Sequence, residues 1–331
     1  MKVIWNYHLA HEFPEEIAAL RRALPDHTIL VAEDRTDFES LVVGADVVVC
    51  GPLVDRELER ADSLKAHMLP YAGANALPLA TYRKRGIVVG NSHGNADVVA
   101  ERAVSLALAL TGRVVEYHND LAQGIWHRRA DRAQIFDYWT SILGADVTIV
   151  GTGAIGTRIA GLLSGFGCRI RGVRRRAQPA GAQPPSGFES ITSNLQDALT
   201  GAQLVFLCVP LSEETRGLIG GAELARMDGS FLVNVSRGEI VSEYDLYHAL
   251  QSGGLAGAAL DTWWQYPTGL TDTQHPSSLP FHSLKNVVMS PHAASHTRNG
   301  KLSQMRQTIE NIVSFCTDGE LVYPVDPETG Y

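Results

Sequence analysis

Three glycines form the clearest chemical pattern in the sequence. Gly151, Gly153 and Gly156 have the spacing G-x-G-x-x-G, with Ala154 and Ile155 inside it, and they join an apolar β-rich run to a helical period. In that context the first glycine permits a tight turn, the second lets the backbone approach a pyrophosphate, and the third lets helix and strand pack closely. The helix N-terminus adds free N–H groups that favour an anion. The pattern therefore predicts dinucleotide binding.

Two arginines stand where dinucleotide-binding proteins select between coenzymes. Arg174 and Arg175 lie about 20 residues after the glycine turn, where an acidic residue commonly accepts hydrogen bonds from the ribose. A carboxylate would repel a ribose 2′-phosphate, whereas a guanidinium pairs with it through two hydrogen bonds. The arginines favour NADP(H) as the coenzyme. NAD(H) stays open as the alternative, and a solvated basic loop is the interpretation without a function.

Three further segments carry ionisable side chains directly after β-rich runs. Arg237 lies in N-V-S-R-G-E-I-V, Asp261 in A-A-L-D-T-W-W, and His292 in V-V-M-S-P-H-A-A. Parallel strands end at a common edge of their sheet, and open α/β sheets bind their ligands at that edge. We therefore expect these three segments to border one site.

The elements that must position these side chains alternate between β-rich runs and helical periods, which predicts parallel sheets covered by helices on both faces. The first series of predicted strands is Lys2–Trp5, Thr28–Ala32, Ala45–Cys50, Ala66–Leu69 and Gly86–Gly90. The second series is Ala145–Val150, Arg169–Val173, Leu204–Val209, Phe231–Asn234, Ala256–Leu260 and Asn286–Ser290. Between them one long helix is expected over Asp97–Asp120, and a last helix over Thr297–Cys316 precedes an extended strap, Leu321–Tyr331.

Charge and cysteine usage limit the possible partners. The 331 residues include 28 Lys and Arg against 36 Asp and Glu, a net charge of -8, which argues against nucleic acid because phosphates require a basic face. The four cysteines are far apart and show no metal-ligand spacing, so we expect no metal site. The N-terminus has no signal-peptide pattern, and the most apolar helical run, Val98–Leu110, is shorter than the about 20 residues that a bilayer requires. We expect no membrane partner and a cytoplasmic location.

Several motifs in order along most of the chain carry a resemblance to one family. Besides the glycine turn they are R-G-I-V-V-G-N-S, N-A-D-V-V-A-E ending at Glu101, and C-V-P-L-S-E-E-T-R-G-L-I from Cys208. Together they resemble the D-isomer-specific 2-hydroxyacid dehydrogenases. The resemblance implies an α/β protein of two Rossmann-like domains with parallel sheets, one flavodoxin-like and one NAD(P)-binding. It implies a substrate domain of residues 1–95 plus 297–331, a coenzyme domain of residues 96–296, and a homodimer with contacts from Trp126 and the basic arm that follows it.

The family's activity is hydride transfer between a nicotinamide and a small anionic acid, which interconverts a 2-oxo acid and a D-2-hydroxy acid. Arg237 offers a rigid fork to the carboxylate and carbonyl oxygens, and His292 can donate a proton to the carbonyl oxygen. The catalytic residues that the resemblance implies are Arg237, His292, Gln265 and Tyr266. The coenzyme-binding residues are Gly151, Gly153, Ala154, Ile155, Gly156, Arg174, Arg175, Val209, Pro210, Thr215, Val235, Ser236 and Asp261, the last at the nicotinamide carboxamide. The substrate-binding residues are Tyr71, Ala72, Gly73, Asn95 and Arg237.

One departure from the family pattern affects the histidine. The family usually has a Glu five residues after the position of Asp261, and here that position is Tyr266. A Glu stabilises imidazolium, whereas Tyr266 or Gln265 can orient the ring without supplying a charge. We therefore predict that the pKa of His292 lies below that of relatives with the Glu.

Three alternatives stay open within the same superfamily. Formate dehydrogenases have a Gln beside the histidine and an Asn before the V-A-E glutamate, and Gln265 and Asn95 stand near those positions. Phosphite oxidation is a second branch. A third possibility is a non-catalytic, NAD(H)-sensing corepressor-like protein, which the missing Glu leaves open.

Overall fold

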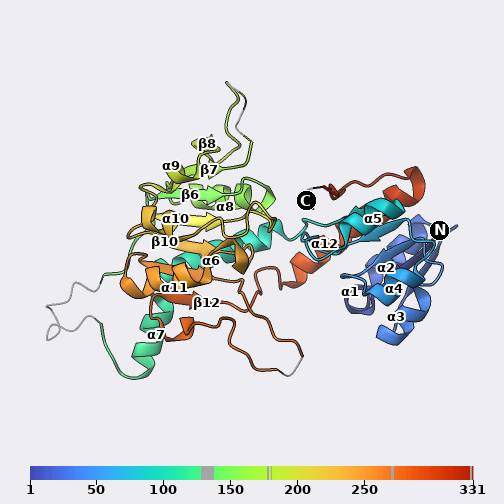
Figure 1. The fold of residues 1–331 in the computed structure, drawn as a ribbon, viewed down its shortest axis with the longest axis horizontal. Coiled ribbons are helices and arrows are strands. Elements are labelled where there is room, and N and C mark those ends of the chain that lie inside the picture. Colours follow the sequence, from blue (N-terminus) through green and yellow to red (C-terminus); the bar gives the residue numbers. More distant parts are fainter. Residues whose placement is uncertain (128–137, 177–178, 180, 270–271, 329, 331) are drawn as a thin grey trace. The chain divides into compact units, whose positions relative to one another are not determined.

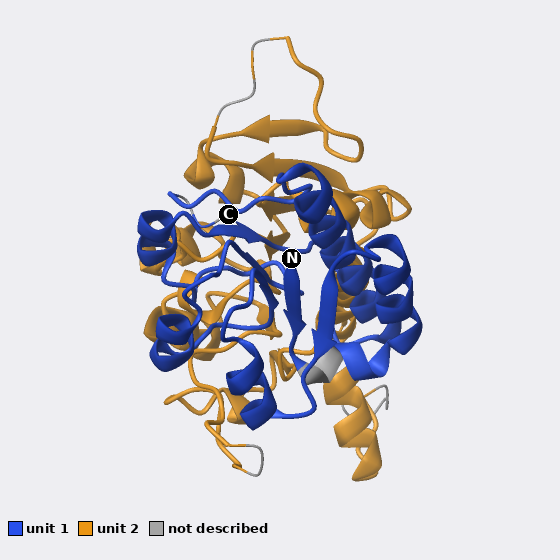
Figure 2. Ribbon diagram, turned by 90° about the vertical axis from the view of Figure 1, so that its right-hand side faces the viewer, with its two compact units in different colours: residues 1–96, 295–331 blue, residues 97–294 orange. Residues whose placement is uncertain are grey.

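The computed structural model divides the protein into two compact units. It describes all residues except 128–137, 177–178, 180, 270–271, 329 and 331. Unit 1 comprises Met1–Ala96 and Ser295–Tyr331, and unit 2 comprises Asp97–Ala294 (Figure 2).

Unit 1 contains a parallel sheet of five strands among its described residues, in the order β2-β1-β3-β4-β5. This is the flavodoxin-like order. The strands are β1 (Lys2–Trp5), β2 (Thr28–Val31), β3 (Val47–Val49), β4 (Ala66–Met68) and β5 (Val88–Gly90). Val47, Val48 and Val49 are all buried, as expected of a central strand with helices on both faces.

The helices of unit 1 bury apolar residues on both faces of its sheet, in two separate core clusters. They are α1 (Tyr7–Glu12), α2 (Pro14–Ala23), α3 (Arg35–Leu41), α4 (Asp55–Arg60), α5 (Leu79–Arg85) and α12 (Arg298–Asp318) (Figure 1). Helix α12 begins one residue after the predicted start, because the Thr297 side chain caps it by accepting a hydrogen bond from Gly300 N. The expected C-terminal strap is confirmed, since Pro324 pairs antiparallel with Gly90 and Val325 N donates to Val89 O.

Unit 2 contains a parallel sheet of seven strands among its described residues, in the order β12-β11-β10-β9-β6-β7-β8. Numbered within the unit this is the Rossmann order 3-2-1-4-5-6 with one strand added, so the predicted fold class is confirmed. The strands are β6 (Asp146–Val150), β7 (Arg169–Val173), β8 (Ser190–Thr192), β9 (Leu204–Leu207), β10 (Phe231–Asn234), β11 (Gly257–Leu260) and β12 (Val287–Met289). The edge strand β8 was not predicted, because a strand of three residues, none of them buried, gives little apolar signal.

Helices cover both faces of this sheet as well (Figure 1). They are α6 (Ala96–Thr111), which starts at the last residue assigned to unit 1, α7 (Val114–Ala122), α8 (Ala154–Ser164), α9 (Leu195–Leu199), α10 (Gly221–Arg226), α11 (Glu243–Ser252) and the short turns η2 (Gly238–Ile240) and η3 (Phe281–Ser283). Among the described residues, no helix is long and apolar enough to cross a membrane.

The prediction of a single helix over Asp97–Asp120 was wrong. Helix α6 ends at Thr111, and Arg113 adopts a left-handed backbone conformation with φ of 52° before α7 begins. Gly112 favours this break because glycine is a poor residue for a helix interior. The Arg113 guanidinium stabilises the new helix start by pairing with Glu116 at 2.7 Å.

Candidate active site

The glycine turn connects β6 to α8, and each glycine meets a different requirement. Gly151 has a φ of 104°, and a Cβ there would lie 2.8 Å from the Cys208 carbonyl carbon after β9. A Cβ on Gly156 would lie 2.0 Å from Gly151 O, so helix and turn can pack only around glycine. Gly153 faces open space and precedes the exposed Ala154 at the helix N-terminus. The turn therefore leaves its outer face free, which is what a dinucleotide pyrophosphate requires.

The predicted coenzyme-selecting arginines lie at the end of β7, the strand beside β6. Arg174 N donates to Thr192 O, and the Arg174 Nε donates to Arg176 O at 3.0 Å. The Arg175 Nη1 lies 3.1 Å from Glu214 Oε2, and both side chains are more than half exposed. The guanidinium groups are thus accessible to a ligand at this edge of the sheet.

The loops after β9 and β10 carry the next predicted coenzyme residues. Thr215 Oγ1 donates to Pro210 O at 2.6 Å, which folds the loop after β9 back on itself. The Ser236 hydroxyl donates to the Val209 carbonyl, and this bond ties the two loops together. Val235 lies directly before Ser236 and is buried. These residues therefore follow β9, the strand next to β6, and β10, the strand beyond it, at the carboxyl edge that also bears the glycine turn.

Arg237 follows β10 in a tightly held loop. Asn234 Nδ2 donates to Arg237 O at 2.9 Å, and the guanidinium Nη1 donates to Ser236 O at 2.7 Å. A Cβ on Gly238 would lie 2.3 Å from the Trp263 carbonyl, so this loop packs directly against the one after β11. The half-buried Arg237 side chain is thereby positioned between two strand ends.

His292 follows β12 and has a strained backbone. Its φ of 55° lies in the left-handed region, which a non-glycine residue enters at a cost of about 1–3 kcal/mol. The residue is exposed on the surface of unit 2. Partial desolvation lowers the pKa of the imidazole, and the positive charge of Arg237 lowers it further, while the Asp261 charge acts in the opposite direction. Arg237 and His292 are therefore electrostatically coupled.

Asp261 is fully buried at the end of β11, and its carboxylate is engaged by the histidine loop. Oδ1 accepts from Ser290 Oγ at 2.5 Å and from Ala293 N at 3.0 Å, and Oδ2 accepts from Ala294 N at 3.0 Å. The sequence indicated that Asp261 lies near His292 but not that it binds the Ser290 side chain before it and the backbone amides of Ala293 and Ala294 after it. Ser290 and its further partner Arg102 were not among the predicted residues, although a charge inside the apolar run of α6 was a visible signal.

Tyr266 lies beside His292, at 5.5 Å between ring centroids. Its hydroxyl accepts a hydrogen bond from Trp263 N at 3.2 Å, and partial burial raises the pKa of the phenol. Gln265 is engaged elsewhere, because its side-chain oxygen accepts from Gln274 Nε2 and its N–H donates to Pro276 O. Of the two residues expected at the missing Glu, Tyr266 is therefore the one in ring contact with the histidine.

Besides Arg237, the predicted substrate residues lie in unit 1, after β4 and β5. Asn91 Nδ2 donates to Ala72 O at 2.8 Å, and Ser92 N donates to Tyr71 O, so the two strand ends are joined. Asn95 follows in the same turn, half-buried, directly before α6. The N–H groups of Ala72 and Gly73 have no hydrogen-bond partner among the described residues. Across all residues that the structure describes, no group of three or more His, Cys, Asp or Glu side chains is arranged to hold a metal.

The family comparison agrees with this geometry. Residues 104–294 match the model of the D-isomer specific 2-hydroxyacid dehydrogenase, NAD binding domain. The glyoxylate reductase of Korarchaeum cryptofilum is 31% identical over 296 residues, which cover 88% of this chain and 83% of the relative. The glyoxylate reductase of Aeropyrum pernix is 33% identical over 262 residues, covering 78% and 75%.

A solved structure shows the same fold. The NADPH-dependent glyoxylate/hydroxypyruvate reductase of Sinorhizobium meliloti, in complex with NADP and malonate, aligns with a TM-score of 0.75 at 23% identity. The alignment covers 99% of this chain and 97% of that one. By family model and by identity, this chain belongs to the D-isomer-specific 2-hydroxyacid dehydrogenase family.

Proposed function

We propose that the protein reduces a small 2-oxo acid to the D-2-hydroxy acid, with NADPH preferred over NADH. The observation that carries the proposal is that the loops of Arg237 and His292 meet at Trp263: Gly238 packs against the Trp263 carbonyl, and the Trp263 indole Nε1 donates to Ser290 O. A cation that binds carboxylate and a neighbouring proton donor are the two groups that reduction of a 2-oxo acid requires. The relatives named as glyoxylate reductases support a small substrate.

Each residue has a defined task in this proposal. The bound nicotinamide supplies the hydride to the substrate carbonyl carbon. Arg237 binds the carboxylate and stabilises the negative charge that develops on the carbonyl oxygen. His292 donates its proton to that oxygen and takes one back in the reverse direction, with Tyr266 packed against its ring. Gln265 then acts only through the loop that bears Tyr266.

Coenzyme preference rests on the arginines at the end of β7. Arg174 and Arg175 would hold a ribose 2′-phosphate, and Glu214 would yield Arg175 to that stronger anion. The exposed turn at Gly153 and Ala154 would hold the pyrophosphate. The remaining predicted residues, including Val209 and Thr215, would line the nicotinamide side. Asp261 has no exposed surface and would act only through the loop that it holds.

We assign a different binding function to each unit. We assign residues 96–296 to coenzyme binding and residues 1–95 plus 297–331 to substrate binding, with Tyr71, Asn95 and the N–H groups of Ala72 and Gly73 as the binding groups of the second segment. Two adjacent backbone N–H groups form a small anion site of this kind. We place the enzyme in the cytoplasm, in keeping with its four unpaired cysteines.

Helix α7 supports a homodimer. None of its residues is buried, and four apolar residues on and just after it are more than 40% exposed, which is typical of an interface. They are Val114, Val115, Leu121 and Trp126. The basic arm that follows falls mostly in 128–137, outside the described residues.

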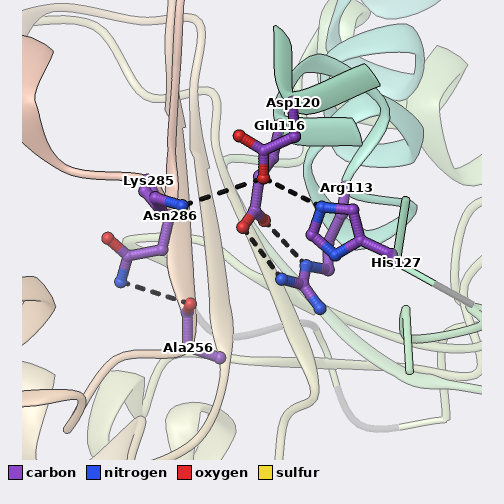
Figure 3. Close-up of polar contacts among 7 residues, drawn as sticks. All are labelled: Arg113, Glu116, Asp120, His127, Ala256, Lys285 and Asn286. Atoms are coloured by element: carbon purple, nitrogen blue, oxygen red, sulfur yellow. Dashed lines mark hydrogen bonds and ion pairs between the residues drawn. The ribbon is translucent and has the colours of Figure 1, made fainter. Parts of the chain in front are cut away.

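An ionic contact between Asp120 and Lys285 links this helix to the segment before β12, and two further contacts lie within the helix and its flanking residues. Asp120 accepts from His127 Nε2 at 2.8 Å and lies 3.8 Å from Lys285 Nζ, while Arg113 pairs with Glu116 (Figure 3). The apolar residues of α7 are therefore displayed by a helix that is itself anchored. Val115→Glu should convert a dimer to a monomer in light scattering, and an unchanged mass would contradict the interface.

A substrate panel tests the proposed function. Glyoxylate, hydroxypyruvate, pyruvate and bulkier 2-oxo acids are offered with NADPH and with NADH, and formate and phosphite are offered with NADP and NAD. We expect turnover with a 2-oxo acid, faster with NADPH. Oxidation of formate or phosphite would move the chain to another branch, and coenzyme binding without any turnover would favour the corepressor-like alternative.

A further inference from the structure

The structure assigns a positioning role to Arg102, which holds the loop that bears His292 through Ser290 and Asp261. The inference deepens the proposed function and rests on it, because His292 is the proton donor in that function. All of the contacts involved lie within unit 2.

The chain of contacts begins in helix α6. The Arg102 Nη2 donates to Ser290 Oγ at 3.1 Å, and the same hydroxyl donates to Asp261 Oδ1 at 2.5 Å. Ser290 is buried and Asp261 has no exposed surface. A hydroxyl that accepts from a cation and donates to an anion is polarised in both bonds, which strengthens each of them in a low-dielectric interior.

The charges explain why these two groups belong together. A fully buried carboxylate is costly unless hydrogen bonds and an opposite charge compensate it. Among the described residues, Asp261 forms no direct ion pair, and the Arg102 side chain forms only the bond to Ser290, with its buried Nε unpartnered. Arg102 therefore acts as the counter-charge of Asp261 through the Ser290 hydroxyl.

At its other end, this series of contacts reaches the backbone around His292. Asp261 accepts from Ala293 N and Ala294 N, the two amides that follow His292, while Ser290 lies two residues before it. Trp263 Nε1 also fixes this segment by donating to Ser290 O at 2.8 Å. The strained φ of 55° at His292 is thus enclosed by hydrogen bonds on both sides, and strain of this kind persists only where the surroundings fix it.

The consequence is specific to this chain. The imidazole lacks the carboxylate that the family usually places beside it, since Tyr266 stands there. Its direction is therefore set by the backbone on which it is mounted, and that backbone is held by the Arg102–Ser290–Asp261 relay. Loss of Arg102 or of the Ser290 hydroxyl should displace the proton donor without removing any group that touches substrate or coenzyme.

Two variants test the relay. Arg102→Met keeps much of the side-chain volume but removes charge and donor, and Ser290→Ala removes one oxygen. In both we expect kcat to fall by about 10- to 100-fold, while KM for the 2-oxo acid and Kd for NADPH change less than about twofold, because misplacement of a reacting group affects the chemical step. Arg102→Lys should recover part of the lost kcat, since it restores the charge.

The control is Arg306→Met, which breaks an exposed ion pair with Glu16 in unit 1 and should leave kcat unchanged. Unchanged kcat in both relay variants would overturn the inference. So would parallel losses in kcat, KM and thermal stability that Arg102→Lys does not relieve, because these would indicate a merely structural arginine.

A readout without turnover separates this inference from the proposed function. The imidazole NMR signal of His292, assigned by its loss in His292→Gln, should shift in Arg102→Met and in Ser290→Ala but not in Arg306→Met. If the wild-type protein reduces no 2-oxo acid, the proposed function fails while this shift still tests the relay. An unmoved signal in both relay variants would contradict the relay.

Discussion

The rings of Tyr266 and His292 are in contact, 5.5 Å apart between centroids and inclined at 52°, and the tyrosine hydroxyl is bound to Trp263 N. The position that usually supplies a charge to the histidine therefore supplies an aromatic face instead. Partial desolvation and the Arg237 charge then lower the pKa of His292, with only Asp261 acting against them.

Replacing the tyrosine by the usual residue should extend activity to higher pH. Reduction requires the protonated imidazole, so its rate falls as pH rises through the pKa of His292. In Tyr266→Glu the new carboxylate stabilises imidazolium and raises that pKa, which moves the fall in kcat to higher pH. Tyr266→Gln is the neutral control and should leave the fall in place. The measurement is the pH profile of kcat, and identical profiles for the two variants would contradict the argument.

Removal of the imidazole should affect chemistry and not coenzyme binding. We expect His292→Gln to lower kcat by about 10²- to 10⁴-fold, the usual contribution of a positioned acid. The Kd for NADPH, measured by fluorescence titration, should stay the same because His292 lies outside the glycine turn and the β7 arginines. A variant that keeps most of its activity would show that another group delivers the proton.

Arg237 should affect both the substrate and the pKa of its neighbour. Arg237→Gln removes the fork and the charge, so kcat/KM for the 2-oxo acid should fall by about 10²- to 10³-fold. The pKa of His292 should rise at the same time, because the Arg237 charge lowers it in the native protein. Arg237→Lys keeps the charge and should lose activity without that rise. The two effects are followed by kinetics and by NMR titration of His292.

The sequence predicts which elements and residues form this site, but it does not predict how their loops are arranged. The strand ends, the glycine turn and the positions of Arg237, Asp261 and His292 follow from periodicity and motif spacing, which are local properties. The left-handed φ of His292 and the hold of Asp261 on Ala293 N and Ala294 N do not, because they depend on which loops meet at the sheet edge. Arg102 is a clear case, since its partner Ser290 lies 188 residues away in the sequence.

Two features of the fold could not be predicted from the local sequence. The break between α6 and α7 lies at Gly112 and Arg113, where the apolar periodicity continues on both sides and conceals the left-handed turn. Strand β8 was missed because its place in the sheet is set by pairing with β7, as Gly172 pairs with Ile191, and not by its own composition. In both cases tertiary contacts outweighed the local pattern.

Reversal of charge at the end of β7 should alter coenzyme choice. Arg174→Asp would place a carboxylate against the 2′-phosphate, and we expect kcat/KM for NADPH to fall by about 10- to 100-fold while that for NADH changes little. Arg171→Ala, on the same strand, removes a guanidinium that donates to Asp197 O and serves as the control. Equal losses with both coenzymes would show that Arg174 supports the fold and does not select the coenzyme.

A buried histidine in unit 1 should make stability depend on pH. His67 is fully buried between Tyr82 Oη, at 2.8 Å from its Nδ1, and the Cys50 backbone carbonyl. Burial lowers its pKa from the ordinary 6.5 to about 4, against the effect of backbone hydrogen bonds. Between these values the unfolded chain binds a proton that the folded chain does not. Stability present above pH 6.5 is therefore lost as pH falls toward 4, by about 3 kcal/mol.

The comparison with His67→Gln isolates this contribution. Glutamine can still hydrogen-bond to Tyr82 but does not titrate, so its free energy of unfolding should decline less on acidification. Urea unfolding at a series of pH values measures both proteins. Parallel declines would show that His67 is protonated in the folded state as readily as in the unfolded chain.

The most direct test of the central claim is the product formed from hydroxypyruvate and NADPH, analysed on a chiral column together with the rate of NADPH oxidation. We expect D-glycerate to form at the rate at which NADPH is consumed, and both rates to be lost in His292→Gln. Formation of L-glycerate, or NADPH consumption that is the same with and without the imidazole, would contradict it.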